Sequence, residues 1–209
     1  MMELGNYLIR IPALLIALTF HEFAHGYAAN QLGDPTARFQ GRLTLNPLVH
    51  LDPIGLLMLW FAGFGWAKPV PVNPLNFRGD KKQGMVLVAA AGPGINLVLA
   101  FVALILQGFI FVFFYNDVLL SLVGTLVTYN ILLAIFNLIP IPPLDGSKIL
   151  AGLLPFRYDY YFRQLEQYGP FLLILLVFTG AFGLIIWPLA SYIYFFMATI
   201  ANIFLGIFI

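Results

Sequence analysis

The sequence contains no cysteine and little charge, and each shortage excludes a class of structure. Without cysteine, the chain can form neither disulfides nor a thiolate metal site, so any metal must be held by histidine or oxygen ligands. Only 9% of the 209 residues are charged, whereas soluble globular domains carry about a quarter. The formal net charge of +1 and the lack of a basic stripe argue against nucleic acid as a partner.

Hydrophobic residues make up 61% of the chain. Apolar runs recur from one end of the sequence to the other, which predicts a single integral-membrane domain over residues 1–209. The first of these runs carries His21, Glu22 and His25 and has no small-residue cleavage site. We therefore interpret it as part of the mature protein and not as a signal peptide.

The apolar runs predict three membrane helices followed by a C-terminal helical hairpin. The three helices are expected at about residues 7–29, 84–114 and 119–141, because about 20 apolar residues are needed to cross a bilayer. The hairpin is expected in two halves, at about residues 170–182 and 187–208. Its first half is short for a full span, so a re-entrant helix is the alternative there.

Basic residues indicate the side of the membrane on which the loops lie. Lysine and arginine gather in the loops 30–83 and 142–168, which fall on the same side in the predicted arrangement. Because cytoplasmic loops are rich in these residues, we expect the 30–83 loop in the cytoplasm and the N-terminus outside. The protein is expected to lie in the lipid bilayer of a prokaryotic cell membrane.

Residues 36–76 are the irregular part of the sequence. Repeated proline and asparagine, without a helical period, predict short strands and turns. The apolar stretch 54–65 is too short to span, so we expect it to dip into or lie on the cytoplasmic leaflet. The expected fold is an all-α polytopic membrane protein with a small membrane-associated β-containing insertion and C-terminal helices at about 170–208.

The sequence His-Glu-Phe-Ala-His in the first predicted helix carries the strongest chemical signal. His21 and His25 are one helical turn apart, where both imidazoles can reach one zinc ion. Glu22 stands beside the first ligand, in position to act as general base toward a water that zinc acidifies. Each ionisable group at the centre of a membrane helix costs about 2.5–3.5 kcal/mol, which calls for a partner such as a metal. The alternative is a polar cluster near the interface that binds nothing.

Zinc needs a third protein ligand, for which Asp145 is the candidate. The first and third predicted helices both end on the cytoplasmic side, so the histidines and Asp145 approach one depth in the membrane. Prolines at positions 140, 142 and 143 prevent a regular helix before Asp145, and an unwound end can turn its carboxylate inward. The alternative is a helix that merely ends at the membrane surface.

Two further motifs accompany the histidine pair. One is Asn137-x-x-Pro140-x-Pro142-x-Leu144-Asp145-Gly146, and the other is the Gly92–Asn96 stretch, Gly-Pro-Gly-Ile-Asn. The set resembles the site-2 protease family of intramembrane zinc metalloproteases, over about residues 7–150.

This resemblance implies a three-helix catalytic core and one zinc ion per chain, and we expect a short form of the family without the PDZ or CBS domains that many relatives carry. The residues it implies are His21, His25 and Asp145 as zinc ligands, Glu22 as catalytic base, and Asn137 and Asn96 near the substrate and the oxyanion. It also implies that residues 36–76 are a β region whose edge pairs with an unwound substrate strand.

Three of the polar residues have alternatives that the sequence leaves open. Asn96 and Asn137 can instead link membrane helices, since such an amide hydrogen bond contributes about 1 kcal/mol. His50 is a fourth ligand, a gate on the site, or a loop histidine bonded to the nearby Asp52.

The function expected from these residues is hydrolysis of peptide bonds in transmembrane or membrane-associated proteins near the cytoplasmic face. Glu22 would activate the attacking water, and the partners would be a transmembrane protein substrate and the lipid bilayer. The alternative is a membrane transporter, or a metal-binding membrane protein, that uses the same histidine and glutamate cluster.

Overall fold

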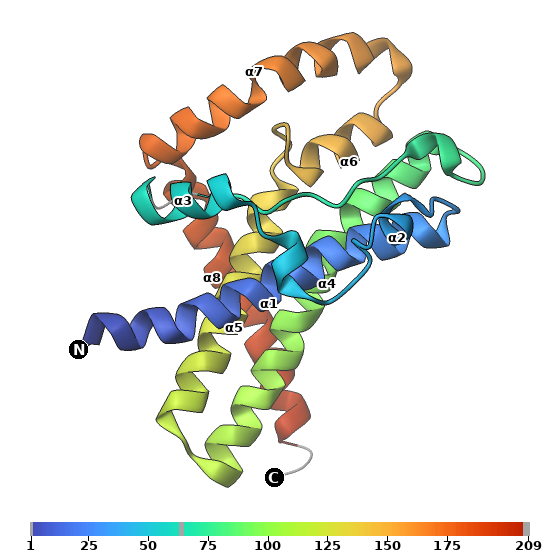
Figure 1. The fold of residues 1–209 in the computed structure, drawn as a ribbon. Helices are drawn as coiled ribbons and strands as arrows, with labels where there is room; N and C mark the ends of the chain where they lie inside the picture. The colour runs from blue at the N-terminus through green and yellow to red at the C-terminus, as the bar shows by residue number, and fades with distance from the viewer. Residues whose placement is uncertain (1, 63–64, 207–209) are drawn as a thin grey trace.

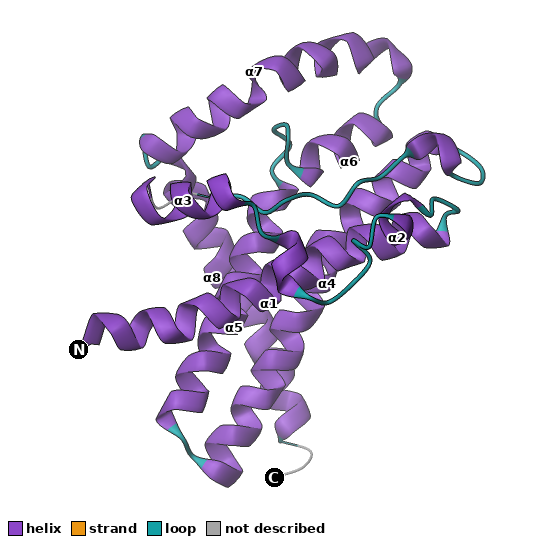
Figure 2. Ribbon diagram, in the orientation of Figure 1, coloured by secondary structure: helices purple, strands orange, loops and turns teal. Residues whose placement is uncertain are grey.

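The computed structural model describes residues 2–62 and 65–206, and its regular structure is helical (Figure 2). Four long helices carry the architecture: α1 (Met2–Gln31), α4 (Lys81–Phe109), α5 (Asp117–Leu138) and α8 (Ala181–Leu205). Figure 1 shows α4, α5 and α8 running side by side, with α1 crossing α4 and α5.

Shorter elements connect the long helices. Between α1 and α4 lie α2 (Thr36–Phe39), η1 (Pro47–His50), α3 (Pro53–Ala62) and η2 (Pro74–Asn76). A π turn, η3 (Ile110–Phe114), extends α4 toward α5. After α5 come α6 (Asp145–Leu153), η4 (Phe156–Tyr158) and α7 (Asp159–Phe178), which leads into α8.

Side-chain caps set the starts of the two central helices. The Asp80 carboxylate accepts a hydrogen bond from the Gln83 N–H at 2.7 Å, and α4 begins at Lys81, directly after Asp80. The Asn116 side chain accepts from the Leu119 N–H at 3.0 Å, and α5 begins after it. Each cap satisfies a backbone donor that the first helical turn leaves without a partner.

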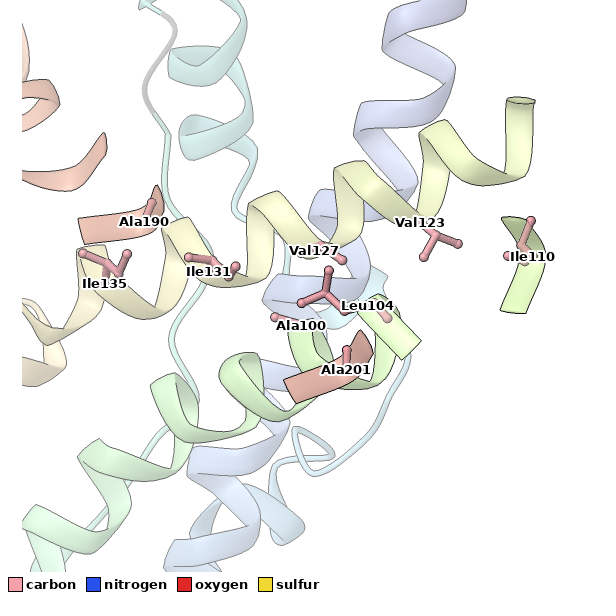
Figure 3. Packing of buried hydrophobic residues seen from close by; sticks show 10 residues of the cluster. Ala100, Leu104, Ile110, Val123, Val127, Ile131, Ile135, Ala190 and Ala201 are labelled. Carbon is pink, nitrogen blue, oxygen red and sulfur yellow. The ribbon is translucent and has the colours of Figure 1, made fainter. Parts of the chain in front are cut away.

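The apolar core lies between α4, α5 and α8 (Figure 3). Val127 and Ile131 of α5 are almost fully buried in it. Alanines from the two neighbouring helices complete it, including Ala100 and Ala103 of α4 and Ala201 of α8. Small residues at such contacts let membrane helices approach closely, so dispersion forces hold the bundle together.

By length and composition, three helices in the described part of the chain could cross a membrane. They are α4 with its π turn (Lys81–Phe114), α5 and α8. The protein is therefore an integral membrane protein, as expected. The second and third predicted helices match α4 and α5. The first predicted helix corresponds to α1, which carries the ionisable residues of the HEFAH motif and is not among the three.

The C-terminal region forms two helices, but the first begins earlier than predicted, at Asp159, and the turn between them also lies earlier. The sequence suggested a break between residues 182 and 187, whereas α7 ends at Phe178 and α8 starts at Ala181. Gly180 takes a left-handed conformation with φ 71°, which glycine adopts at no steric cost. Pro188 lies inside α8, whereas the second half of the hairpin was expected to begin only at about residue 187.

The expected β-containing insertion is wrong. Residues 36–62 and 65–76 form short helices and turns, and their β pairing is limited to one isolated bridge between Leu51 and Ala67. Prolines begin η1, α3 and η2, because proline suits the first turn of a helix. The apolar stretch 54–65, which was predicted to lie at the leaflet, belongs to α3 as far as Ala62. Residues 63–64 lie outside the described residues, and Gly65 has no regular structure.

Candidate metal centre

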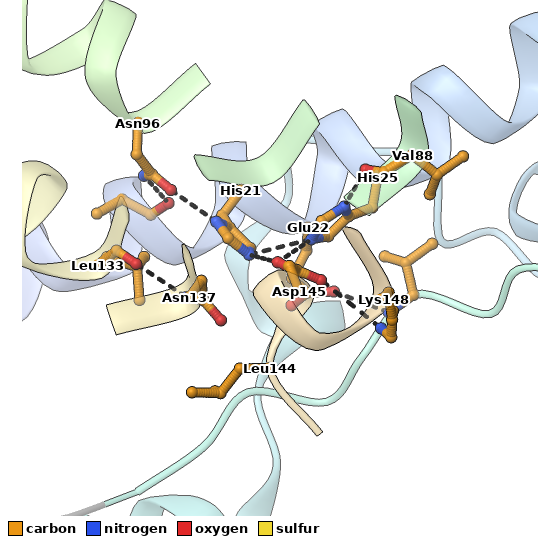
Figure 4. Close-up of polar contacts among 12 residues, drawn as sticks. His21, Glu22, His25, Val88, Asn96, Leu133, Asn137, Leu144, Asp145 and Lys148 are labelled. Carbon is orange, nitrogen blue, oxygen red and sulfur yellow. Dashed lines mark hydrogen bonds and ion pairs between the residues drawn. The ribbon is translucent and has the colours of Figure 1, made fainter. Parts of the chain in front are cut away.

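The two histidines of the HEFAH motif are buried on α1, and α4 fixes both imidazoles (Figure 4). The Nδ1 atom of His21 lies 2.6 Å from the side-chain oxygen of Asn96. The Nδ1 atom of His25 lies 2.7 Å from the backbone oxygen of Val88. Both partner oxygens accept a hydrogen bond, so each ring carries its hydrogen on Nδ1 and leaves the lone pair of Nε2 free.

Asp145 comes to the histidines because the chain turns back after α5. The helix ends at Leu138, the proline-rich residues 139–144 form a turn, and Asp145 is the first residue of α6. Gly146 sits directly against the backbone oxygen of Leu138, where a side chain would collide with the carbonyl groups of the turn. The Asp-Gly pair therefore allows the tight return that aims the carboxylate at α1.

Three donor atoms converge in the middle of this site. The Oδ2 atom of Asp145 lies 3.1 Å from Nε2 of His21 and 3.0 Å from Nε2 of His25, and the two Nε2 atoms are 3.0 Å apart. Tetrahedral zinc with bonds of about 2.0–2.1 Å places its ligands about 3.3 Å apart. Three lone pairs that face one another repel unless a cation stands between them, so these residues fit a zinc ion.

Gly92 of α4 allows the two helices to approach at this point. A Cβ atom at position 92 would lie 2.5 Å from Nε2 of His25 and 2.7 Å from Cε1 of His21. Any side chain there would occupy space that the two imidazoles need. The glycine of the Gly92–Asn96 motif is thus required by the geometry of the site.

Glu22 lies beside the three ligands and faces a cavity of about 320 Å³. Its Oε2 atom accepts a hydrogen bond from the backbone N–H of Val70 at 2.8 Å. Val70 belongs to the irregular segment 68–73, which Arg42 holds through a 2.7 Å hydrogen bond to the backbone oxygen of Lys68. This segment forms one wall of the cavity, and the zinc cluster forms another.

Lys148 is a cavity residue that the sequence reasoning missed. Its ammonium group lies 3.6 Å from Oδ1 of Asp145, the carboxylate oxygen that does not face the histidines. Its place three residues after Asp145 on a helix was the available signal, since residues at that spacing share a face. The contact favours a carboxylate that presents only Oδ2 to the metal.

The other predicted site residues differ in their partners and in whether they line the cavity. Asn96 is fully buried and touches His21 directly. Asn137 lines the cavity, and its Nδ2 donates to the backbone oxygen of Leu133 at 3.0 Å. The Nε2 atom of His50 is instead hydrogen-bonded to the backbone oxygen of Thr44 at 2.9 Å, and His50 does not line the cavity.

Asn130 on α5 is a second residue that the sequence reasoning missed. It is fully buried, and its side-chain oxygen accepts from Asn96 at 2.7 Å. The signal for it was an amide in the middle of an apolar membrane helix, because such groups are rare unless they are paired.

Comparisons with known proteins agree with this chemistry. Residues 113–180 match the model of Peptidase family M50. The chain is 40% identical to "Putative zinc metalloprotease YwhC" of Bacillus subtilis, over 87% of this chain and 85% of the relative. It is 31% identical to "Putative zinc metalloprotease Rip2" of Mycolicibacterium smegmatis, over 88% of this chain and 73% of the relative. No solved structure matches.

Proposed function

Because the chain belongs to Peptidase family M50, the site-2 protease family of zinc metalloproteases, we propose that it cleaves peptide bonds of transmembrane or membrane-associated proteins. The single observation that carries this proposal is the convergence of three lone-pair donors beside Glu22 in a cavity. A transporter needs no general base next to its metal ligands, so the family and the site together favour proteolysis.

His21, His25 and Asp145 would hold the cofactor Zn²⁺, one ion per chain. When bound, zinc supplies a Lewis acid that polarises a peptide carbonyl and lowers the pKa of water. The hydrogen bonds from the two Nδ1 atoms to Asn96 and Val88 keep both rings in the orientation and tautomer that metal binding needs.

Glu22 is the general base of the proposed reaction. The Val70 N–H fixes Oε2 at 2.8 Å, which leaves Oε1 to take a proton from the attacking water. Glu22 would then give this proton to the nitrogen of the leaving amine. The Val70 bond keeps the carboxylate from rotating away between the two steps.

Asn137 and Lys148 are suited to the charge that develops on the substrate oxygen. Both line the cavity. The Nδ2 group of Asn137 has two hydrogens, and its bond to Leu133 uses one of them. The other hydrogen, together with the Lys148 ammonium, can stabilise an oxyanion in the cavity.

The cleavage site would lie near the cytoplasmic face. In the proposed orientation, the N-terminus is outside and the 30–83 loop is cytoplasmic, because both basic loops then face the cytoplasm. The N-terminal part of α4, which follows the 30–83 loop, carries Val88 and Gly92 of the metal centre. A substrate helix would have to unwind locally before a peptide bond could reach Glu22.

The test compares membrane proteins from cells that carry the intact chain, Glu22→Gln or Asp145→Ala. We expect protein fragments only with the intact chain. Purified Glu22→Gln should keep one zinc ion while its turnover falls by about 10²–10⁴-fold, because the amide keeps the shape but not the base. Asp145→Ala should lose zinc as well, since two protein ligands remain.

Two results would overturn the proposal. If Glu22→Gln cells produce the same fragments as the intact chain, Glu22 is not the base. If Asp145→Ala retains one tightly held zinc ion, the proposed ligand set is wrong.

A further inference from the structure

A row of buried polar side chains crosses the bundle from α1 through α4 to α5. The Nδ1 atom of His21 is 2.6 Å from Oδ1 of Asn96, and Nδ2 of Asn96 is 2.7 Å from Oδ1 of Asn130. Both asparagines have no exposed surface. Asn130 is therefore linked to the ligand His21 only through the side-chain amide of Asn96.

Two backbone oxygens fix the direction of every hydrogen bond in this row. Nδ2 of Asn96 donates to the oxygen of Ala17 at 3.1 Å, and Nδ2 of Asn130 donates to the oxygen of Leu126 at 2.9 Å. A carbonyl oxygen can only accept, so these contacts decide which end of each amide is nitrogen. Asn130 must then present its oxygen to Asn96, and Asn96 must present its oxygen to His21.

The direction of these hydrogen bonds determines which nitrogen of His21 carries the proton. Since Asn96 offers His21 an acceptor, the imidazole proton is held on Nδ1, and the lone pair of Nε2 points toward Asp145. If the Asn96 amide rotated by half a turn, its NH₂ group would face Nδ1. The imidazole proton would then have to sit on Nε2, where it blocks metal binding.

We propose that Asn130 is a positioning residue of the metal centre, which prevents the Asn96 amide from rotating and so fixes the tautomer of His21. Asn130 and Ala17 together accept both hydrogens of the Asn96 NH₂ group. In the rotated amide, the Asn96 oxygen would face the oxygens of Asn130 and Ala17, and both bonds would become repulsions. Without Asn130, only the Ala17 contact opposes rotation.

This inference rests on the ligand set of the proposed function, but its test measures zinc affinity and not proteolysis. Purified full-length protein in detergent is titrated with zinc against a chelator of known affinity. Asn130→Leu, which keeps the volume but removes the acceptor, should bind zinc about tenfold more weakly. Asn130→Ala should behave in the same way, which guards against a misfolded leucine variant.

A control removes a side-chain hydrogen bond from the exposed face of the same helix. Thr128 donates from its hydroxyl to the backbone oxygen of Gly124 at 2.9 Å, a bond that involves neither asparagine. Thr128→Val should keep the zinc affinity of the intact chain.

A double-mutant cycle separates positioning from a general loss of structure. In Asn96→Ala, there is no amide whose rotation Asn130 could prevent, so the role of Asn130 disappears. Adding Asn130→Leu to Asn96→Ala should therefore change zinc affinity by less than about twofold. Equal losses in both backgrounds would overturn the proposal, and so would an Asn130→Leu protein with unchanged zinc affinity. If the single variant Asp145→Ala also leaves zinc affinity unchanged, the ligand set fails as well.

Discussion

The two halves of α4 perform different tasks with different residues. The first half faces the metal centre with Val88, Gly92 and Asn96, and it contributes a backbone oxygen, an empty space and an amide. The second half faces α5 and α8 with Ala100, Ala103 and Leu104, which contribute only apolar volume (Figure 3). We refer to these as the site half and the packing half of α4.

The contrast shows that the two halves should tolerate change differently. In the site half, a shift of a few tenths of an ångström at an imidazole changes the ligand geometry. In the packing half, side chains need only fill space, so volume-conserving changes cost little. Substitutions in the site half should therefore affect zinc, while those in the packing half should affect the free energy of unfolding.

The largest effect is expected from Gly92→Ala. The added Cβ would lie 2.5 Å from Nε2 of His25, a separation that real contacts do not adopt, so the imidazoles must move. We expect a loss of more than about 100-fold in zinc affinity and no measurable proteolysis, since a misplacement near 1 Å can by itself cost about 10²-fold in activity. Chelator competition and metal analysis of the purified variant measure the first effect.

Gly94→Ala is the matched control two residues away. A Cβ at position 94 would meet nothing within 4 Å. Zinc affinity should therefore equal that of the intact chain. If both alanine variants lose zinc alike, the effect comes from the loss of glycine in the helix and not from contact between a Cβ atom at position 92 and the imidazoles.

How far the sequence predicted the site depends on the kind of residue. His21, His25 and Asp145 came from spacing and membrane depth, and the structure brings them together. Val70 could not be ranked in the same way, because a backbone donor in an irregular segment has no side-chain signature. Its position follows from how residues 68–73 line the cavity.

The sequence predicted those helices that are specified by a long apolar run. It did not predict the elements whose type depends on how each proline is used. The runs that became α4 and α5 are long and apolar, so length alone located them. The residues 36–76 contain prolines that end helices in one context and begin them in another. Pro47 and Pro74 follow Asn46 and Asn73, whose side chains cap the short helical turns, so local capping formed helices where strands were expected.

An intermediate effect is expected from Leu104→Ala in the packing half. Leu104 is 6% exposed, and its removal leaves a cavity between α4 and its neighbours. The free energy of unfolding should fall by about 2–4 kcal/mol, while zinc affinity stays the same. Leu106→Ala is the control on the same helix, because Leu106 is 48% exposed and should cost far less. A loss of zinc in Leu104→Ala would show that the two halves of α4 are coupled.

The smallest effect concerns how the cavity wall formed by residues 68–73 is held. Asp34 follows α1, is buried, and accepts hydrogen bonds from the Asn73 N–H at 2.6 Å and from Nδ2 of Asn76 at 2.8 Å. These bonds tie the end of the 68–73 segment to the end of α1. Burial by itself raises the pKa of the Asp34 carboxyl, but hydrogen bonds from Thr36 and these two asparagines outweigh it and hold the pKa below its usual value.

A lowered pKa in the folded state means that the ionised carboxylate stabilises the fold. That stabilisation is complete above the unfolded pKa of about 3.9, and it is lost as the pH falls through the lower pKa of the folded state. Asp34→Asn should therefore cost about 1 kcal/mol at pH 7, and the cost should shrink below about pH 4. Thermal unfolding midpoints of both proteins, measured with zinc removed by a chelator, should differ by about 2–4 °C at neutral pH and converge in acid. A difference that stays constant down to pH values well below the unfolded pKa would show that Asp34 acts through its shape and not through its charge, so that the wall of the cavity is held by packing, as the second half of α4 is.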